Sequence, residues 1–398
     1  MAAVVSIALE LLVGALALGV LAVSTVLFVE VLAAILGRSS PEAERGERRS
    51  VAALIPAHNE SLLIAATIRS LAPQLLEHDR LVVVADNCTD DTAAIAAAEG
   101  AEVVVRTDAE RRGKGYALDA GVNFLRAAPP DVVLIVDADC LLSADAVDRL
   151  ARMVVARGKP AQALNLMQAT ADAAPSMRLA EFAWLVKNKV RPQGLDRLRL
   201  PCQLAGTGMA FPWAALSSAT LATGHITEDL KLGLELAREG WAPQLCHGAL
   251  VTSKFPSSSA GIKSQRTRWE HGHLSVISRD APGLLLHALG ARNWKLLAMT
   301  IDLCVPPTSL LVLLGALSWT CGALLWLLPG SVWWPLAAAS IAFALITASV
   351  AASWFVYARK VLRLSDLLLG AGYAVRKVPL YARFLVSRQI DWVRSRRD

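Results

Sequence analysis

Apolar runs stand near both ends of the chain, and a region of mixed polar and apolar positions lies between them. Residues 11–36 carry one charged side chain, Glu30, over more than the roughly 20 residues that a membrane-crossing helix needs. Two further apolar runs, residues 307–328 and 332–358, are separated by a short turn containing Pro and Gly. The pattern predicts one N-terminal transmembrane helix and a C-terminal transmembrane hairpin. Because no Lys or Arg precedes the first run, we expect a retained anchor rather than a secretory signal.

Between residues 51 and 157, short runs rich in β-branched residues alternate with longer helical patterns. Strands are expected at residues 51–56, 81–86, 102–106 and 132–136, with Pro56 ending the first of them. This alternation predicts an α/β domain with a doubly wound, mostly parallel sheet. The G-x-G-x-x-G signature of dinucleotide-binding folds does not open this region.

After residue 157 the pattern is less regular. We expect a strand at residues 162–169, helices at 177–189 and 265–277, and a Gly-containing strand or loop at 203–211. Thr227-Glu-Asp229 should open another helix, with Thr227 as its cap and its apolar positions on one face. Residues 284–298 are apolar but interrupted by His and basic residues, which predicts a helix lying on the membrane surface.

Composition and charge support a membrane protein. The chain is 55% hydrophobic, and its formal net charge is +6. Basic side chains follow the first and the last predicted spans: Arg38, Arg45, Arg48, Arg49, Arg359, Lys360 and Arg363. The positive-inside rule then places residues 38–295 in the cytoplasm and the N-terminus outside. We expect the membrane to be a bacterial inner membrane. We expect contacts with anionic membrane lipids, and no pattern indicates a nucleic-acid partner. The six cysteines form no C-x-x-C pair, so neither zinc nor a disulfide framework is expected.

These observations divide the chain into six segments. They are an N-terminal transmembrane anchor (1–37), a linker (38–50), a cytoplasmic α/β domain (51–280), an amphipathic interface helix (281–306), a transmembrane hairpin (307–358) and a basic interfacial tail (359–398).

Asp137 and Asp139 directly follow the central predicted strand, at the sheet edge where open α/β sheets bind ligands. Two carboxylates there can share Mg²⁺ or Mn²⁺, which also takes oxygen ligands from a nucleotide diphosphate. The alternative is a solvated turn in which Asp139 caps the next helix. For an isolated Asp-x-Asp that alternative is the better one, so the neighbouring motifs decide.

Four clusters fall at loop edges of the predicted sheet. They are Asp86, Asp137 with Asp139, Thr227-Glu-Asp229, and Gln265-Arg-Thr-Arg-Trp269. Between Asp229 and Gln265 lie 35 residues, and a membrane hairpin follows. This set resembles the family 2 glycosyltransferases, and among them the processive polysaccharide synthases related to cellulose and hyaluronan synthases. The resemblance covers residues 51–277 with the flanking spans, and it implies a GT-A-type, Rossmann-like fold.

The resemblance implies a donor site at the edge of the sheet. Its residues would be Pro56, Ala57, Glu60, Asp86, Lys114, Asp137, Gln265 and Arg268. Asp86 would bind the uracil or ribose, and Lys114, between two glycines, the diphosphate. Gln265 and Arg268 are three positions apart on one helical face, so they can reach the diphosphate together. The alternatives are a helix-capping turn for Asp86 and a flexible basic loop for Lys114.

Asp137 and Asp139 would then hold the metal, Mg²⁺ or Mn²⁺, whose charge stabilises the departing diphosphate. Asp229 is the candidate general base, because inversion at an anomeric carbon needs an acceptor hydroxyl stripped of its proton. We expect Glu228 to point elsewhere and to act in capping. The alternative for Asp229 is an ordinary acid in the first turn of a helix.

The acceptor side is less defined. Trp269 could stack on a sugar ring or anchor the protein at the interface. Gly206-Thr207-Gly208 resembles the segment that shapes the acceptor site, but it departs from the Cys-Gly form of the family, so acceptor identity stays open. His271 and His273 fit a third metal ligand less well than a polar helix surface. Asp302 could line a polar route or lie at headgroup depth.

The sequence thus predicts an inverting glycosyltransferase that extends an exopolysaccharide or other glycan from a nucleotide-sugar donor, with uridine as the expected base. Three transmembrane helices would form only a narrow channel, so a homodimer or an export partner could complete a path for the product. The alternative is a single-transfer enzyme that glycosylates a lipid carrier or a membrane lipid. A non-catalytic export component is a third reading, which the intact set of acids argues against.

Overall fold

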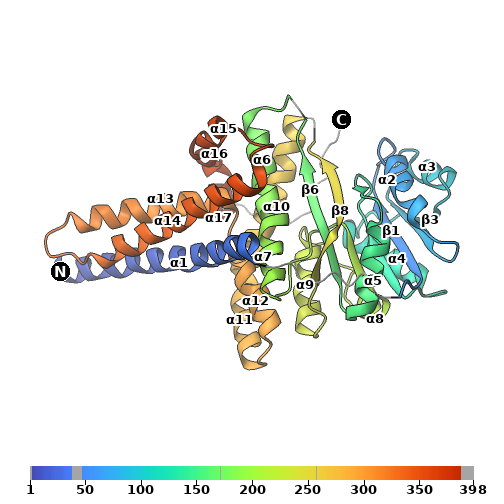
Figure 1. Cartoon of the computed structure of the whole chain (residues 1–398), viewed down its shortest axis with the longest axis horizontal. Coiled ribbons are helices and arrows are strands. Elements are labelled where there is room, and N and C mark those ends of the chain that lie inside the picture. The colour runs from blue at the N-terminus through green and yellow to red at the C-terminus, as the bar shows by residue number, and fades with distance from the viewer. Residues whose placement is uncertain (1, 38–46, 171, 257, 387–398) are drawn as a thin grey trace.

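The computed structural model describes residues 2–37, 47–170, 172–256 and 258–386. Most of the expected linker and the basic end of the expected tail lie outside these residues. Figure 1 shows long helices projecting from one side of an α/β domain. Within the described residues, three helices are long and apolar enough to cross a membrane, namely Ile7–Leu36, Thr308–Trp326 and Trp334–Ala358. They agree with the predicted N-terminal span and C-terminal hairpin.

Small residues let these helices approach closely. Helix α1 (Ala2–Leu36) packs against α13 (Thr308–Trp326) and α14 (Trp334–Ser353), which continues into the π-helical turn η3 (Trp354–Ala358). A Cβ on Gly14 would lie 2.1 Å from the Trp334 ring, and one on Gly322 would lie 3.0 Å from the backbone of Leu336. Without a hydrophobic driving force between helices in lipid, such close van der Waals packing stabilises the bundle.

The described strands form one mixed, eight-stranded sheet with the order β3-β2-β1-β4-β7-β6-β8-β5. The strands are β1 (Val51–Ala57), β2 (Arg80–Asp86), β3 (Glu102–Arg106), β4 (Val132–Ile135), β5 (Leu141–Leu142), β6 (Ala161–Gln168), β7 (Met209–Pro212) and β8 (Gln244–Lys254). β1 to β4 are parallel to one another, while β7 runs antiparallel to β4 and β6. The predicted mostly parallel α/β sheet is confirmed.

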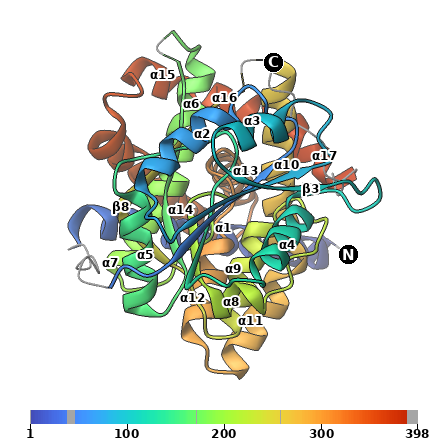
Figure 2. The same ribbon diagram turned by 90° about the vertical axis from the view of Figure 1, so that its right-hand side faces the viewer.

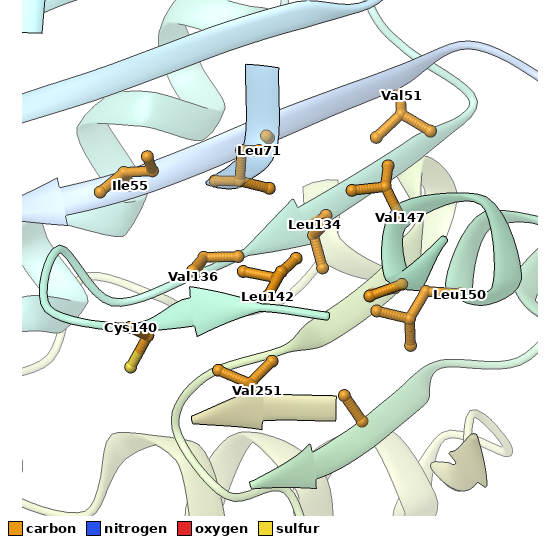
Figure 3. Close-up of a cluster of buried hydrophobic side chains, with 14 of the residues drawn as sticks. Val51, Ile55, Leu71, Leu134, Val136, Cys140, Leu142, Val147, Leu150 and Val251 are labelled. Carbon is orange, nitrogen blue, oxygen red and sulfur yellow. The ribbon is translucent and has the colours of Figure 1, made fainter. Parts of the chain in front are cut away.

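Alternate residues of the central strands pack against the two faces of the sheet, as the period of a strand requires. Val51, Ala53 and Ile55 join the cluster drawn in Figure 3, whereas Ala52 and Leu54 join the opposite one. The first face is covered by α2 (Ile64–Leu71), α3 (Thr92–Ala98) and α5 (Ala146–Arg157). The second is covered by α4 (Lys114–Leu125), α8 (Trp213–Ser217) and α9 (Glu228–Arg238). Figure 2 shows α2 and α3 on one side of the sheet and α4 and α8 on the other.

Among the remaining described helices, the short η1 (Ala72–Gln74) follows α2 within the domain, and the others lie between the domain and the spans. These others are α6 (Pro175–Leu185), the π-helical turn η2 (Val186–Val190), α7 (Arg191–Arg197), α10 (Ser259–Arg279), α11 (Ala281–Gly290), α12 (Trp294–Leu303), α15 (Leu364–Leu368), α16 (Gly370–Val375) and α17 (Val378–Val386). Figure 1 shows α6, α10 and α17 where the α/β domain meets the long helices.

Two expectations about element boundaries are wrong. Pro56 does not end β1, which runs on to Ala57. This is tolerated because the ladder with β4 stops at Leu54, so only β2 pairs with Pro56. The expected helix at 177–189 extends through a π-helical turn to Arg197. The expected Gly-containing strand or loop at 203–211 is a loop that leads into β7 at Met209.

The expected single interface helix is two helices, α11 and α12. Arg292 adopts a left-handed conformation with φ 51° between them, and Asn293 caps α12 by accepting a hydrogen bond from the backbone N–H of Leu296 at 3.0 Å. Thr227 does not cap α9 through its side chain, contrary to expectation.

Candidate active site

A cavity of about 310 Å³ opens where β1, β2 and β4 end. It is lined by all but one of the residues that the sequence singled out for the donor, the metal, the base and the acceptor: Pro56, Ala57, Glu60, Asp86, Lys114, Asp137, Asp139, Gly206, Thr207, Asp229, Gln265, Arg268 and Trp269. Gly208 lies behind the wall, where a Cβ would be 2.6 Å from Val251. The carboxyl ends of parallel strands meet at this edge, which is why distant loops converge.

At the β1–β2 end of the cavity, Asp86 is 5% exposed and accepts a hydrogen bond from Arg106 Nη1 at 2.6 Å. The turn before α3 is organised by Asp90 instead, which accepts from the backbone N–H groups of Ser61 and Thr92. Burial would raise the pKa of Asp90, but these hydrogen bonds outweigh it and lower the pKa to about 2. The carboxylate of Asp86 is therefore not the one that holds the turn.

Lys114 reaches the centre of the cavity from the start of α4. Its Nζ lies 2.5 Å from Asp137 Oδ1 and 2.5 Å from the carbonyl oxygen of Gly206. Gly115 makes this approach possible, because a Cβ there would lie 2.5 Å from the carbonyl oxygens of Leu221 and Thr223. Burial alone would lower the pKa of Lys114, but Asp137 and the acids of α9 raise it, so the ammonium stays charged.

Asp137, Asp139 and Cys140 form a cluster whose ligand atoms lie within 4.8 Å of one another, among the residues that the structure describes. The backbone N–H of Asp137 donates to Thr207 Oγ1 at 3.1 Å, which fixes the start of this loop. Burial raises the pKa of the Cys140 thiol to about 12, so its sulfur stays protonated. The two carboxylates therefore make a hard oxygen pair that fits Mg²⁺ or Mn²⁺ better than a thiophilic metal.

Helix α9 meets the cavity with its N-terminal end. Consecutive residues from Ile226 to Leu230 line the wall, so both Glu228 and Asp229 face the cavity. The expectation that Glu228 points elsewhere is wrong, because a helix approached from its end presents every side chain of its first turn. Burial raises the pKa of both carboxyls and their mutual repulsion adds to it for Glu228, while Lys114 opposes the rise at Asp229.

Gly206 and Gly272 bring the loops around Asp229 together. Gly206 has φ 83°, and a Cβ there would lie 3.3 Å from Asp229 Oδ2. A Cβ on Gly272 of α10 would lie 2.3 Å from Thr227, so the missing side chain lets α10 lie against the start of α9. This contact is what places the Gln265–Trp269 motif beside Asp229.

Gln265, Arg268 and Trp269 project from α10 into the cavity. Burial lowers the pKa of Arg268, and the carboxylates that face it work against this change. The Trp269 ring packs on the Trp184 ring with a centroid separation of 4.5 Å and an interplanar angle of 40°. Trp184 is fixed in turn by donating from Nε1 to the carbonyl oxygen of Asn165 at 3.0 Å. The pair forms an aromatic platform suited to a sugar ring.

Sequence reasoning missed one whole wall of the cavity. Trp184, Lys187, Asn188 and Arg191 line it from α6, η2 and α7. Asn188 Nδ2 is buried without a hydrogen-bond partner among the described residues, and so are Asn165 Oδ1 and Gln203 Oε1 at the same end. The sequence offered only a weak signal, because these residues recur at helical spacing in a helix that also carries other polar side chains.

The two histidines after Trp269 are neither metal ligands in the described cluster nor surface residues. His271 and His273 are 2% and 6% exposed and bond to the carbonyl oxygens of Leu380 and Leu303. Burial lowers the pKa of His273 to about 3, so its imidazole is neutral. Their role is to tie α10 to α12 and α17.

At the far end of the cavity, Arg191 joins the α/β domain to α1 and α12. Its Nε donates to Glu30 Oε2 of α1 at 2.7 Å, and its Nη2 donates to Asp302 Oδ1 at 2.5 Å. Gln203 donates to Asp302 Oδ2 at 3.0 Å. Asp302 is 4% exposed and lines the cavity, so it is buried in protein rather than exposed at headgroup depth.

The model of one protein family, described as glycosyltransferase-like family 2, matches residues 48–272. Poly-β-1,6-N-acetyl-D-glucosamine synthase of Staphylococcus aureus is 23% identical over 250 residues, which cover 60% of this chain and 58% of that protein. An uncharacterized glycosyltransferase of Mycobacterium bovis is 33% identical over 123 residues, 29% of this chain and 52% of that protein. The chain thus spans little more than half the length of these curated relatives.

Among solved structures, a mannosyltransferase from Pyrobaculum calidifontis in complex with GDP-mannose and Mn²⁺ is similar along almost the whole chain. The match covers 95% of this chain and 100% of that one, with a TM-score of 0.52 and 15% identity. At this identity the likeness concerns the fold, and it confirms the expected GT-A architecture.

Proposed function

The chain belongs to glycosyltransferase-like family 2, and we propose that it is an inverting, metal-assisted hexosyltransferase that takes its sugar from a nucleoside diphosphate donor. The observation that carries the proposal is the convergence of Lys114, Asp137, Asp139, Asp229 and Arg268 on one cavity. Each has the charge that one step of glycosyl transfer requires, and they come from segments far apart in the sequence.

The donor lies along the β1–β4 edge. Asp86 binds the nucleoside, with Pro56, Ala57 and Glu60 beside it, and uridine is the base that we propose. Lys114 and Arg268 neutralise the diphosphate, and Gln265 hydrogen-bonds to it. Asp137 and Asp139 hold Mg²⁺ or Mn²⁺, which supplies positive charge to the departing nucleoside diphosphate.

Asp229 acts as the general base. Burial raises its pKa, so it is a better proton acceptor than an exposed aspartate, and the charge of Lys114 opposes that rise. It takes the proton of the acceptor hydroxyl, the hydroxyl oxygen bonds to the anomeric carbon, and the bond to the diphosphate oxygen breaks on the opposite face. Trp269 and Trp184 support the acceptor ring, and the Gly206–Gly208 loop limits its depth.

For the acceptor we propose the end of a growing exopolysaccharide, in line with the Staphylococcus aureus relatives, which are named as polysaccharide synthases. The second candidate is a lipid-linked acceptor that receives a single sugar. The far end of the cavity favours it, because Asp302 and Leu303 there belong to α12, directly before the span α13.

The three apolar helices fit a membrane protein. We propose a bacterial inner membrane, with the α/β domain in the cytoplasm, α11 and α12 at the membrane surface and the segment boundaries that the sequence suggests. A homodimer or an export partner would serve a long product, whereas single transfer to a lipid needs neither.

The test is a donor screen on membranes that contain the full-length protein, with Mg²⁺ or Mn²⁺ and a panel of nucleotide sugars. We expect nucleotide release with one donor and its loss in the Asp229→Asn variant. Mass analysis of the product then separates a ladder of glycans from a single adduct. Release that is equal in wild type and variant with every donor refutes the proposal.

A further inference from the structure

A second cavity, of about 110 Å³, adjoins the first behind the two tryptophans. Trp184, Trp269, Lys187, Gln265 and His273 line both cavities, so the second one continues the acceptor end of the first. Its other walls come from α10, from residues 306–309 at the start of α13, and from Tyr373 and Lys377. Figure 1 shows α6, α10 and α16 meeting the long helices in this region.

The second cavity differs in charge from the donor end of the first. The donor end of the first is rich in carboxylates, whereas the second is lined by four cations, Lys187, Arg191, Arg266 and Lys377, and by one acid, Glu270. Two of these cations are already paired with acids, Arg191 with Glu30 and Asp302, and Lys377 with Glu270 at 2.6 Å. Positive charge therefore remains in excess.

Lys187 is the central group of this excess. Among the described residues it makes no ion pair or hydrogen bond, and its nearest recorded contact places Nζ 6.0 Å from the centre of the Trp184 ring. Burial lowers its pKa, although three surrounding acids oppose the change. Arg266 is likewise without an ion pair among the described residues, and it lies 5.4 Å over the Tyr373 ring.

The backbone adds to this positive end. The first turn of α13, a helix of 19 residues, forms a wall of the cavity, and its cap residue Pro307 offers no side-chain acceptor for the free N–H groups. The N-terminal end of a helix favours anions through these N–H groups and through its dipole. Next to Lys187, Asn188 Nδ2 is a buried donor without a partner among the described residues. Asn188 belongs to the same turn η2 as Lys187 and lines the first cavity only. Two kinds of donor, basic side chains and the N–H groups of α13, therefore converge on the second cavity from separate elements.

From this arrangement we infer that the acceptor is anionic: it carries a phosphoryl group that occupies the second cavity and is bound by Lys187 and Arg266, while its hydroxyl faces Asp229. The inference rests on the proposed transferase function and names the class of its acceptor. The tryptophan pair between the cavities then spans the stretch of acceptor between the phosphoryl group and the hydroxyl.

An electrostatic role in the fold alone accounts less well for Lys187. The acids around it, Asp229, Asp302 and Glu270, each have another cation: Lys114 acts more strongly on Asp229, and the other two have direct ion pairs. A neutral glycan would leave a desolvated ammonium uncompensated, which costs free energy. A phosphoryl oxygen removes that cost through a charge-assisted hydrogen bond.

The phosphoryl group could belong to a membrane lipid or to a soluble phosphate ester, so the experiment has two arms. In the soluble arm, full-length protein in phosphatidylcholine nanodiscs is titrated with glycerol 3-phosphate, with glycerol as the neutral probe, by calorimetry. In the lipid arm, nucleotide release from the donor is compared in nanodiscs with and without phosphatidylglycerol. UDP binding is measured in both as a check on the donor site.

We expect at least one anionic probe to act and its neutral counterpart to fail. Lys187→Gln should weaken binding of glycerol 3-phosphate, or raise the phosphatidylglycerol needed for half-maximal release, about tenfold or more. Lys187→Arg should restore part of the effect. Lys189→Gln is the matched control, because Lys189 lies on the same turn, lines neither cavity and contacts the Tyr357 ring.

A response in one arm identifies the source of the phosphoryl group. A response in both arms supports a site that recognises the phosphoryl group whether it belongs to a lipid or to a soluble ester. Equal responses to anionic and neutral probes in both arms overturn the inference, as do equal responses of the Lys187→Gln and Lys189→Gln variants. Loss of UDP binding in the wild type would instead count against the proposed transferase and leave the anion site to be judged from calorimetry.

Discussion

Two clusters of charged side chains lie at opposite ends of the same cavity, and they differ in how completely they are paired. At the sheet edge, Lys114 pairs with Asp137, whose side chain keeps 34% of its surface exposed, and further acids stand beside it. At the membrane end, Arg191 is held between Glu30 and Asp302, and these side chains are 9%, 2% and 6% exposed. Both clusters pair basic with acidic side chains, but the exposure of those side chains differs.

This difference separates groups that can exchange partners from groups that cannot. The Lys114 cluster has more carboxylates than cations and faces open space, so a metal ion and a diphosphate can replace the contacts that it makes. The Arg191 cluster is enclosed by α1, α7 and α12, and its hydrogen bonds hold the anchor to the domain. Substitutions in the first should alter chemistry, and substitutions in the second should alter stability.

The largest effect is expected at the sheet-edge cluster. Asp229→Asn should lower kcat by about 10² to 10⁴, because the acceptor hydroxyl loses its proton acceptor. Binding of UDP should change little, since the diphosphate contacts remain. Glu235→Gln on the exposed side of the same helix is the control for general damage to α9. An unchanged kcat in the Asp229→Asn variant would show that Asp229 takes no part in the chemistry.

In the enclosed cluster, Arg191→Met should lower the free energy of unfolding by about 3 to 5 kcal/mol, because two buried carboxylates lose their cation. The measurement is thermal unfolding of the full chain in detergent micelles. Arg69→Met is the control, since the Arg69–Glu99 pair is largely exposed on the Arg69 side and should contribute little to the free energy of unfolding. Equal losses in the two variants would show that burial does not separate these pairs.

Lys114→Gln should weaken UDP binding by about 10- to 100-fold, which is the loss of one charge-assisted contact. Its thermal stability should change far less than that of the Arg191 variant, because the partner Asp137 can be solvated from the cavity. Lys159→Gln is a suitable comparison, since Lys159 also donates to a backbone carbonyl, that of Gly240, and does not line the cavity. Titration calorimetry with UDP and Mn²⁺ reports the difference.

The smallest expected effect concerns pH. Asp229 must be ionised to act as base, and burial raises its pKa, so kcat/KM should fall on the acid side at a higher pH than for an exposed aspartate. Below that pKa, the loss should be about tenfold per pH unit. Because Lys114 opposes the rise, Lys114→Gln should move this acid limb to still higher pH. An acid limb that moves down, or stays in place, would contradict the assignment of Asp229.

Much of the sheet edge could be predicted because local patterns determine it. β2 ends at Asp86 and β3 spans Glu102–Arg106 as expected, since runs of β-branched residues define strands and acids mark their ends. The resemblance to the family 2 glycosyltransferases, which includes the 35-residue spacing, placed Asp229 and Gln265 in one site, and both line the cavity. Glu228 was misplaced because a residue's face on a helix does not reveal that the helix approaches the cavity end-on.

The membrane end could not be predicted in the same way. The π-helical turn at Val186–Val190 changes which side chains of that helix point to the cavity, and periodicity of 3.6 does not register such an insertion. Pairing of Glu30 with Arg191 joins residues far apart in sequence, and only the packed structure brings them together. The break between α11 and α12 had a local signal, the cap residue Asn293, which the apolar run around it outweighed.

The hydrogen bond between Arg191 and Glu30 fixes the position of the α/β domain along the axis of α1. Because Glu30 sits at a fixed height along α1, its attachment sets how far the catalytic opening stands from the bilayer. Moving this acid by one helical turn would shift the attachment by about 5.4 Å along the helix axis. In the proposed transferase, the position of Glu30 along α1 would therefore decide at which depth of the membrane, headgroup or hydrocarbon, a lipid-linked acceptor presents its hydroxyl.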